Sequence, residues 1–328
     1  MNKMNKKVIA VITAIMLLAT CLTGCGGGGD KAADPARISF ASGGTSGTYY
    51  PIAGAISTLW TDKVEGLTVD VQSTGASAEN LILIKNGEAE VALVQNDVMY
   101  YAYTATESFA GVDKNESFAT LGTVYPEVVQ LVVAGDSGIE TLADLKGKAV
   151  SIGDVGSGVE SNAKQILAAA GIGLDEITVR NLGFGESANG IKDKTLDAAF
   201  VTAGTPTTAV TELAATNDIK VLSLDQAVID KLCADYGYYT AFTIPADVYG
   251  TAADANTVAV KATIVVKADL SEELVYNMTK TLFENLDVVA ESHAKGKEMK
   301  LESAVDGVSV PLHPGAAKYY AEQGLDVE

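Results

Sequence analysis

Short blocks of apolar residues, each with a regular spacing, cover most of the chain. The apolar residues between 52 and 59 recur every three or four positions, which predicts a helix, and the alternation over 67–71 predicts a half-buried strand. Gly- and Ser-rich turns separate these blocks, so strand, turn, helix and strand follow one another. This order predicts an α/β fold, in which a mostly parallel sheet carries helices on its faces.

The same order starts again in the second half of the chain. An apolar strand is expected at 128–134, and a strand at 149–153 leads through Gly156-Ser157-Gly158 into a helix. A long alternating strand at 257–266 and a helix at 272–285 are expected to return to the first domain. The predicted domains are lobe 1, formed by 37–133 plus 256–328, and lobe 2, formed by 134–255.

The first residues are typical of an export signal. Three lysines precede an apolar run from Val8 to Ala19, which is too short to span a membrane. The run ends at Leu22-Thr23-Gly24-Cys25, which resembles the lipobox of bacterial lipoproteins. We therefore predict a signal peptide at 1–24, a lipidated Cys25 and a Gly-rich tether at 25–36, on the outer face of the cell membrane. The alternative is an ordinary signal peptide that contains a cysteine.

Charge and composition restrict the classes of molecule that the chain is expected to bind. The 328 residues include 42 Asp and Glu against 23 Lys and Arg, which gives a formal net charge of −19. Such a chain repels a phosphate backbone, so small molecules or proteins are expected as partners, and no nucleic acid. The chain has only two His and three Cys, which are the residues that most often bind metals or act as acids and bases near neutral pH. No metal, cofactor or enzymatic activity is therefore expected. Cys233 is expected to be buried as a small apolar residue, and the protein to be a monomer.

Several strand-to-helix turns are rich in Gly, Ser and Thr and poor in charge. The first N–H groups of a helix lack intrahelical partners and lie at the positive end of its dipole, so such turns favour carboxylate or phosphate. The turns at 45–50 and 156–158 are the main candidates, and 202–206 is a third. Gln95 and Asn96 follow an apolar strand, at the end where open α/β sheets bind ligands. Two such turns facing each other predict a cleft for a small anion.

Each of these features also has a purely structural interpretation. Ser157 and Glu160 have the spacing of a capping box, in which the Ser oxygen caps its own helix. Thr45 and Ser46 could likewise be caps, and Tyr49 could be an ordinary half-buried aromatic residue. Both interpretations stay open for these residues.

Basic and catalytic groups are scarce. Arg37 and Arg180 are the only arginines, and Arg37 lies beside the tether, so only Arg180 is available to clamp a carboxylate. Helix N-termini, hydroxyls and amides are therefore expected to hold the ligand. His293 is expected to be solvated and His313 to be packed in a turn. The turn at 44–48 lacks the spacing of a nucleophile elbow.

Four ordered stretches resemble one family. They are 41–51, which reads Ala-Ser-Gly-Gly-Thr-Ser-Gly-Thr-Tyr-Tyr-Pro, then Val94 to Asp97, Asp144 to Lys148 with Gly156 to Gly158, and Leu312 to Ala317. Together they are similar to the pattern of the TAXI family, the solute-binding proteins of one branch of TRAP transporters. The resemblance spans about 38–320. The segment from Asp144 to Lys148 alone is common to many binding proteins, whereas the ordered set is specific.

The resemblance implies a two-lobed type II periplasmic-binding-protein fold with a two-segment hinge. It also implies a small carboxylate solute, such as glutamate or a related C4 or C5 acid, delivered to an ion-driven TRAP membrane permease. The solute would dock on the first turn, and closure would bring the helix N-terminus at Ser157 onto its far side. With the turn analysis, the expected ligand-binding residues are Thr45, Ser46, Tyr49, Gln95, Asn96, Ser157, Gly158, Thr202 and Thr205.

Three alternatives to this function stay open, and the last of them is a surface antigen that binds no solute. The first is a binding protein of an ABC importer, because the same fold and the same lipid anchor serve both kinds of transporter. The second is a surface-anchored serine hydrolase that uses Ser46 or Ser157.

Overall fold

One sheet contains all ten strands of the computed structural model, which describes residues 36–327. The strands are β1 (Arg37–Ala41), β2 (Thr68–Gln72), β3 (Val91–Gln95), β4 (Phe118–Ala134), β5 (Ala149–Ser151), β6 (Thr178–Arg180), β7 (Ala198–Ala203), β8 (Ile219–Leu222), β9 (Thr240–Ile244) and β10 (Ala255–Lys267). Their order is β2-β1-β3-β10-β4-β7-β5-β6, with β8 beside β4 and β9 beside β10. The predicted signal peptide, the lipidated Cys25 and the tether up to residue 35 lie outside the described residues.

Ten α-helices flank this sheet in the described part of the chain. They are α2 (Tyr49–Lys63), α3 (Ser77–Asn86), α4 (Asn96–Thr104), α5 (Gly158–Ala169), α6 (Phe184–Lys192), α7 (Thr208–Ala214), α8 (Gln226–Asp235), α9 (Glu272–Phe283), α10 (Leu286–Ser292) and α11 (Pro314–Glu322). Short 3-10 helices lie at Glu107–Phe109, Leu142–Leu145, Leu174–Glu176, Ala246–Val248, Ala294–Glu298 and Leu301–Ser303. The predicted α/β architecture is therefore confirmed.

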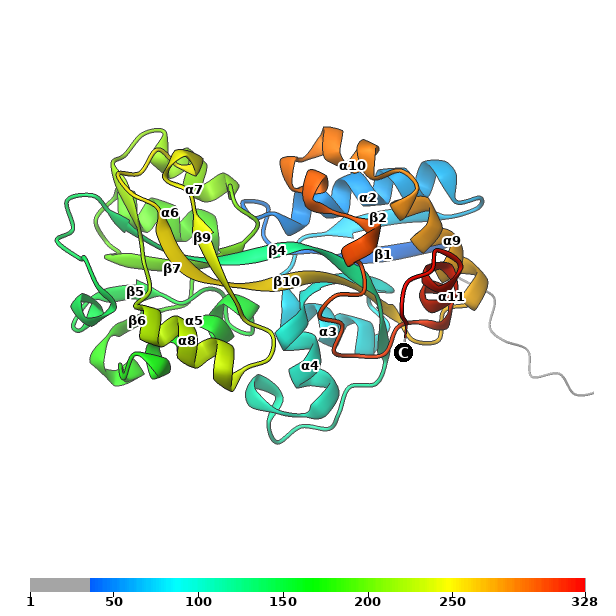
Figure 1. The fold of residues 1–328 in the computed structure, drawn as a ribbon, viewed down its shortest axis with the longest axis horizontal. Coiled ribbons are helices and arrows are strands. Elements are labelled where there is room, and N and C mark those ends of the chain that lie inside the picture. Colours follow the sequence, from blue (N-terminus) through cyan, green and yellow to red (C-terminus); the bar gives the residue numbers. More distant parts are fainter. Residues whose placement is uncertain (1–35, 328) are drawn as a thin grey trace, which may run out of the picture. The chain divides into compact units, whose positions relative to one another are not determined.

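The expectation of a mostly parallel sheet is wrong, because the sheet is parallel at its two ends and antiparallel in its centre, where the two long strands lie. β1 pairs in parallel with β2 and β3, and β5 pairs in parallel with β6 and β7. The long strands β4 and β10 run antiparallel to each other and to their other neighbours. Figure 1 shows β4 and β10 side by side, leading from β1, β2 and α2 at one end to β5, β6 and β7 at the other.

Buried residues divide between these two ends of the sheet. Clusters built from residues up to 125 and from 262 onward include Trp60, which stacks on Phe40 with 5.7 Å between the ring centroids. The remaining clusters are built from buried residues between 128 and 260. The domain limits expected near 134 and 255 fall at the end of β4 and the start of β10. The division into two lobes stays a prediction.

Local sequence signals explain several helix ends. α3 ends at Asn86, and Gly87 follows with a left-handed φ of +74°, which is the usual way for an Asn-Gly pair to end a helix. α11 starts at Pro314, a residue suited to the first turn of a helix because it needs no N–H partner there. His313 caps this helix, because its Nδ1 accepts a hydrogen bond from the Gly315 N–H at 3.2 Å. His313 is buried, as expected for a packed turn residue.

Two element boundaries differ from the sequence-based expectation. β4 starts at Phe118 instead of 128, because residues 118–128 pair with β10. This pairing continues through two register shifts and through Pro126, which has no N–H to donate, so neither feature ends the strand. The second is α7: Thr205-Pro206 in the turn at 202–206 is typical of a helix start, but the helix begins only at Thr208. Thr207 precedes it, and its hydroxyl donates to the Gly204 carbonyl at 2.8 Å, which fixes a turn before the helix starts.

Two single residues were also predicted wrongly. Cys233 is half-buried in α8 and not fully buried, because it lies toward the edge of the apolar face of that helix. His293 is half-buried and not solvated. It lies where α10 gives way to the 3-10 helix Ala294–Glu298, and its Nδ1 accepts from the Lys295 N–H at 3.1 Å. Burial lowers the pKa of His293, and the positive charge of Lys295 adds to this.

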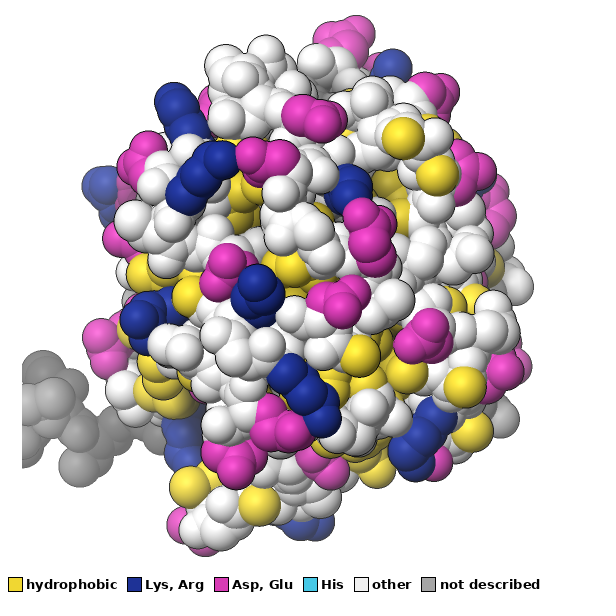
Figure 2. Space-filling model, turned by 90° about the vertical axis from the view of Figure 1, so that its left-hand side faces the viewer, with side chains coloured by type: hydrophobic (Ala, Val, Ile, Leu, Met, Phe, Trp, Pro, Cys, Tyr) yellow, Lys and Arg dark blue, Asp and Glu magenta, His cyan; other side chains and the backbone are white. Residues whose placement is uncertain are grey.

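Between residues 36 and 327, no helix combines the length and the apolar character needed to cross a bilayer. Figure 2 shows the surface at the β5–β6 end of the sheet, where acidic and basic side chains alternate and neither kind forms one continuous patch. The acidic excess of the chain is therefore spread out on this face.

Candidate ligand-binding site

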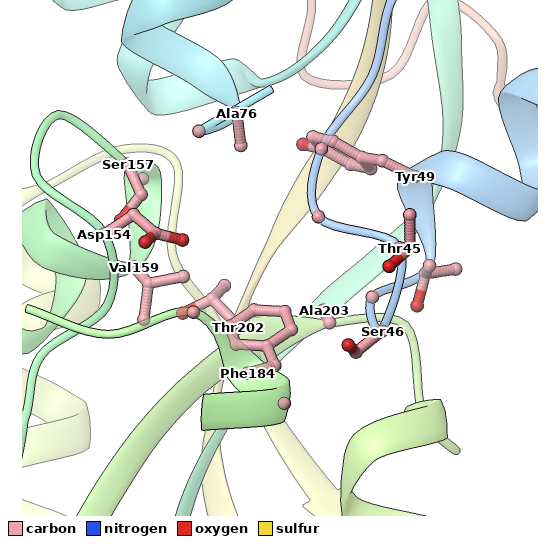
Figure 3. Close-up of a pocket in the computed structure, with 18 of the residues that line it drawn as sticks. Thr45, Ser46, Tyr49, Ala76, Asp154, Ser157, Val159, Phe184, Thr202 and Ala203 are labelled. Carbon is pink, nitrogen blue, oxygen red and sulfur yellow. The ribbon is translucent and has the colours of Figure 1, made fainter. Parts of the chain in front are cut away.

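A cavity of about 420 Å³ lies between the β1–α2 turn and the loops that precede α5 and α6. Its size falls within the range of roughly 300 to 1,000 Å³ that is typical of small-molecule sites. Figure 3 shows Thr45, Ser46 and Tyr49 on one side of it, facing Asp154 and Ser157 on the other. Phe184 contributes an apolar ring between the two sides.

The wall at the N-terminus of α2 offers unused backbone donors. Thr48 caps α2 without a side-chain hydrogen bond, and the first turn holds no acidic residue. The Gly47 N–H donates to the Gly44 carbonyl at 3.0 Å, which tightens the turn. The N–H groups of Thr48 and Tyr49, both lining residues, have no partner among the described residues. This helix end therefore favours a negatively charged group in the cavity.

The wall at the N-terminus of α5 is occupied by its own cap. Ser157 Oγ accepts from the Glu160 N–H at 3.1 Å, and Glu160 Oε2 accepts from the Gly156 N–H at 2.7 Å. The predicted capping interaction is confirmed, and Ser157 also lines the cavity. Gly158 and Val159 keep N–H groups without a partner in the described part of the chain. At the N-terminus of α5, only the N–H groups of Gly158 and Val159 are therefore free in the described structure to bind a ligand, because the Ser157 hydroxyl oxygen already accepts a hydrogen bond.

An acidic side chain stands beside the capped end of α5. Figure 3 shows the carboxylate of Asp154 directed into the space between the two walls. Burial raises the pKa of Asp154, and the nearby carboxylates of Glu186 and Glu79 raise it further. Within residues 36–327, no side chain or backbone group forms a hydrogen bond or ion pair with the Asp154 carboxylate.

A second carboxyl group lies deeper in the cavity. Glu127 is only 2% exposed, and its Oε2 accepts a hydrogen bond from the Tyr49 hydroxyl at 2.6 Å. Burial raises the pKa of Glu127 to about 8, while the bond from Tyr49 and the charge of Lys295 act in the opposite direction. Sequence reasoning missed this residue, although a signal existed: Glu127 is the only charged residue in the seventeen residues of β4.

The end of β7 contributes a hydroxyl group without a partner. Thr202 is 4% exposed, lines the cavity, and its Oγ1 has no hydrogen bond in the described structure. A buried hydroxyl without a partner costs on the order of 1 to 3 kcal/mol. Such a group at a cavity wall points to a ligand that would satisfy it.

Three hydrogen bonds hold the two walls together around the cavity. The Ala209 N–H donates to the Ser46 carbonyl at 3.2 Å, and the Ala78 N–H donates to the Gly156 carbonyl at 3.2 Å. The Thr48 hydroxyl donates to the Gly204 carbonyl at 3.3 Å. These bonds connect the β1–α2 turn and α3 directly to the segments of the opposite wall.

A cluster of buried polar side chains lies next to the cavity, between α4 and α5. Asn162 is its centre: its amide donates to Asp97 Oδ2 at 2.9 Å and to the Tyr239 hydroxyl at 2.8 Å, and its Oδ1 accepts from Gln95 at 2.7 Å. The chain of bonds continues from Tyr239 to Gln165 and on to Tyr101. Gln95 belongs to both regions, because it also lines the cavity.

The structure brings together seven of the nine expected binding residues at the cavity wall. They are Thr45, Ser46, Tyr49, Gln95, Ser157, Gly158 and Thr202. Asn96 and Thr205 are not among the lining residues. Asn96 bonds instead to the backbone, with its Oδ1 accepting from the Lys261 N–H at 3.0 Å. Arg180 is exposed and donates to its neighbour's carbonyl, so it does not reach the cavity.

No group of three or more His, Cys, Asp or Glu side chains is placed to hold a metal ion within residues 36–327. Lining residues that sequence reasoning did not single out include Glu127, Asp154, Phe184 and Glu186. Asp154 lies on a loop, where hydrophobic periodicity gives no information about orientation, and Phe184 and Glu186 lie in the first turn of α6, where the periodic pattern has only just begun.

Solved binding proteins share this fold. The alkanesulfonate-binding protein SsuA from Xanthomonas axonopodis pv. citri, bound to MOPS, is 15% identical, over 88% of this chain and 85% of that chain, with a TM-score of 0.53. PhnD1 from Prochlorococcus marinus in complex with methylphosphonate is 10% identical, over 81% and 92%, with a TM-score of 0.54. A putative L-cystine ABC transporter structure from Listeria monocytogenes is 14% identical, over 82% and 98%, with a TM-score of 0.51. The chain thus has the α/β fold of the periplasmic binding proteins.

The sequence assigns the chain to a family within this class. The sequence model of the NMT1-like family matches residues 40–324, which is most of the chain. The protein therefore belongs to the NMT1-like family.

Proposed function

We propose that the protein is an extracytoplasmic solute-binding lipoprotein that captures a small carboxylate and delivers it to a TRAP-type secondary transporter. The observation that carries this proposal is the cavity itself. Hydrogen bonds join its walls, and it contains an uncapped helix N-terminus together with the Thr202 hydroxyl, which has no partner in the described structure. Unsatisfied donors at the wall of a cavity of this size are what a small polar ligand needs.

The carboxylate of the solute is placed at the N-terminus of α2. The N–H groups of Thr48 and Tyr49 and the hydroxyls of Thr45 and Ser46 border the cavity there. One helix terminus contributes about 0.3 to 1 kcal/mol per charge when exposed and up to about 2 when partly buried. Several hydrogen bonds in the same place, sheltered from water, bring the affinity to the micromolar range.

A thermal-shift screen of the processed protein, purified from its host membrane in detergent and stripped of bound solute, tests this proposal. Amino acids, C4 to C6 mono- and dicarboxylates, sugars and phosphates form the panel. A ligand at about 100 times its dissociation constant stabilises the folded protein by about 2.7 kcal/mol, which raises the melting temperature by a few degrees. A shift with sugars alone, or with no compound, would contradict the proposal.

The transporter is a separate part of the proposal. The resemblance of the turn at 41–51 to TAXI proteins supports a TRAP permease, whereas one structural neighbour carries the name of an ABC transporter. Uptake in vesicles that contain the neighbouring membrane proteins distinguishes the two. A TRAP system is expected to require an ion gradient and no ATP. Uptake that needs ATP hydrolysis would assign the protein to an ABC importer instead.

The lipid anchor is tested on Cys25. We expect wild-type protein to partition into the detergent phase, and Cys25→Ser to prevent acylation and release the protein into the aqueous phase. The binding affinity measured after release should not change, because the tether precedes the described unit. A Cys25→Ser variant that still partitions with membranes would contradict the lipoprotein assignment.

The hydrolase alternative has little support in the site. Ser46 and Ser157 both line the cavity, but no histidine is found among its described lining residues. Ser157 Oγ is engaged as an acceptor in its helix cap. A serine nucleophile requires an adjacent base, so the geometry favours binding over hydrolysis.

A further inference from the structure

The charged side chains that line the cavity are all acidic. Glu127, Asp154 and Glu186 border it, and no Lys, Arg or His is among the described lining residues. A dicarboxylate enclosed here would bring two negative charges to a wall that has no cationic side chain to pair with them. The charge of the cavity therefore restricts the solute more tightly than its size does.

Two of the three carboxyl groups already have a partner. Glu127 accepts from the Tyr49 hydroxyl, and its pKa of about 8 keeps it mostly uncharged at neutral pH. Glu186 caps α6, because its Oε2 accepts from the Gly183 N–H at 3.3 Å. The Asp154 carboxylate has no such bond in the described structure and is directed into the cavity.

The two walls consequently have opposite electrostatic character. At the α2 wall, the first turn has no acidic residue and no side-chain cap. At the α5 wall, the N–H groups of Gly158 and Val159 are also free, but Asp154 adds an unpaired negative charge beside them. A carboxylate of the solute is stabilised at the first wall and repelled at the second, whereas a cationic group has the opposite preference.

An independent observation shows that the space between the walls is polar and unsatisfied. Thr202 Oγ1 is buried, lacks a partner among the described residues, and lies at the cavity wall between Asp154 and the α2 turn in Figure 3. A hydroxyl can donate to a carboxylate or accept from an ammonium group, so it serves either end of a zwitterion.

We propose that the solute carries a protonated amine as well as a carboxylate, with the amine paired to Asp154 and the carboxylate held at the α2 turn. The solute class is then the amino acids, to the exclusion of dicarboxylates without nitrogen. This inference rests on the proposed binding function. It replaces the expectation that the α5 helix end at Ser157 holds the far side of an anion.

Isothermal titration calorimetry on the stripped protein tests this proposal with ligands matched in size. L-glutamate, glutarate and 2-oxoglutarate share a five-carbon diacid skeleton, and only glutamate has the amine. Because the chain length preferred by the cavity is open, the common amino acids are titrated alongside the corresponding amine-free acids. The tightest amino acid is expected to bind at least roughly 10-fold more tightly than its amine-free counterpart, since a charge-assisted hydrogen bond is lost with the amine.

The variant Asp154→Asn tests the residue. It should weaken amino-acid binding by roughly 10- to 100-fold and leave the amine-free acids unchanged or slightly tighter. Asp175→Asn is the matched control, because it removes the same charge from an exposed position in the 3-10 helix Leu174–Glu176, outside the cavity, and should leave both affinities unchanged. Circular dichroism confirms that each variant is folded.

The outcomes separate the inference from the proposed function. Amine-free acids that bind as tightly as their amino-acid counterparts would overturn the inference and leave the binding function standing. Amino-acid binding that Asp154→Asn does not weaken, in a folded variant, would overturn the role of Asp154. If neither acids nor amino acids bind, the inference fails together with the proposed function.

Discussion

The cavity and the buried polar cluster beside it are built from similar side chains but differ in how these are satisfied. In the cluster, each of the six side chains bonds to at least one other member and Asn162 alone joins three of them, although Asp97 Oδ1 has no partner among the described residues. In the cavity, Asp154 and the Thr202 hydroxyl have no partner in the described structure. An unpaired buried group lowers stability. The contrast therefore indicates that the bonds of the cluster hold α4 against α5, whereas the unpaired groups of the cavity are available to bind a solute.

This comparison predicts that polar substitutions in the two regions have different consequences. A change in the cluster should lower the free energy of unfolding, because it leaves several neighbours unpaired. A change in the cavity should mainly lower ligand affinity.

The largest loss of stability is expected for Asn162→Ala. This substitution leaves Gln95, Asp97 and Tyr239 without their shared partner, which is expected to lower the free energy of unfolding by about 2 to 4 kcal/mol. Urea denaturation measures the change. Asn189→Ala, at an exposed cavity residue without a side-chain bond in the described structure, is the control and should change stability by less than about 0.5 kcal/mol. Equal effects of the two variants would refute the distinction between the regions.

Gly158→Ala tests the contact between cluster and cavity. A Cβ at Gly158 would overlap the side-chain amide of Gln95, so Gln95 must move and give up its bond to Asn162. We expect a loss of about 1 to 3 kcal/mol in the same urea assay.

Gly44→Ala is the matched control for this substitution. Gly44 also lines the cavity, but nothing lies within 4 Å of the position that a Cβ would take there, and its φ is not in the left-handed region. The control should stay within about 0.5 kcal/mol of wild type. A Gly158→Ala protein as stable as the control would mean that Gln95 has room to move without loss.

Glu127, in the cavity, is expected to make the stability of the folded protein depend on pH. Burial raises its pKa to about 8 in the folded protein, above its ordinary value near 4.5. The folded state therefore keeps a proton that the unfolded state has released, so stability falls as pH rises from about 4.5 to about 8. The slope is at most about 1.4 kcal/mol per pH unit.

Glu127→Gln is expected to flatten this slope between pH 6 and pH 8, while its amide oxygen still accepts from the Tyr49 hydroxyl. Asp97, whose pKa burial raises to about 6, accounts for part of the slope at lower pH and stays in place as an internal reference. Thermal melts at pH 5, 6, 7 and 8 measure the difference. Parallel curves for wild type and variant would show that Glu127 does not titrate in this range.

Most of the fold was predictable because it depends on periodicity and on turn residues. The apolar spacing at 52–59 and the stop at Asn86-Gly87 correspond to α2 and α3. The pairing of β4 with β10 was not predictable, because long-range antiparallel contacts leave no local signal. The early start of β4 at Phe118 was missed for the same reason, since its first residues belong to the sheet through tertiary pairing.

The site was predictable at its turns and not at its charges. Gly- and Ser-rich turns after strands identify backbone donors, so residues such as Thr45 and Ser157 were found in sequence. Asp154 looks like any other acidic loop residue until the fold shows that it is directed into the cavity. The same limit explains Asn96, which follows the strand as expected but bonds to Lys261 instead of lining the cavity.

Thr202→Val is expected to have the smallest effect on stability. It also distinguishes the cavity from the cluster, because it should change ligand affinity without lowering the free energy of unfolding. It removes a buried hydroxyl that has no partner in the described structure and replaces it with a methyl group of nearly the same size. The free energy of unfolding of the solute-free protein should therefore stay the same or rise by up to about 1 kcal/mol, whereas affinity for the solute should fall roughly 5-fold. Urea denaturation and calorimetry on one preparation measure both. Gln95 provides the contrast, because removing its amide should lower stability through the bond to Asn162. If Thr202→Val lowers stability instead, its hydroxyl has a structural role, and the wall it lies on belongs with the cluster.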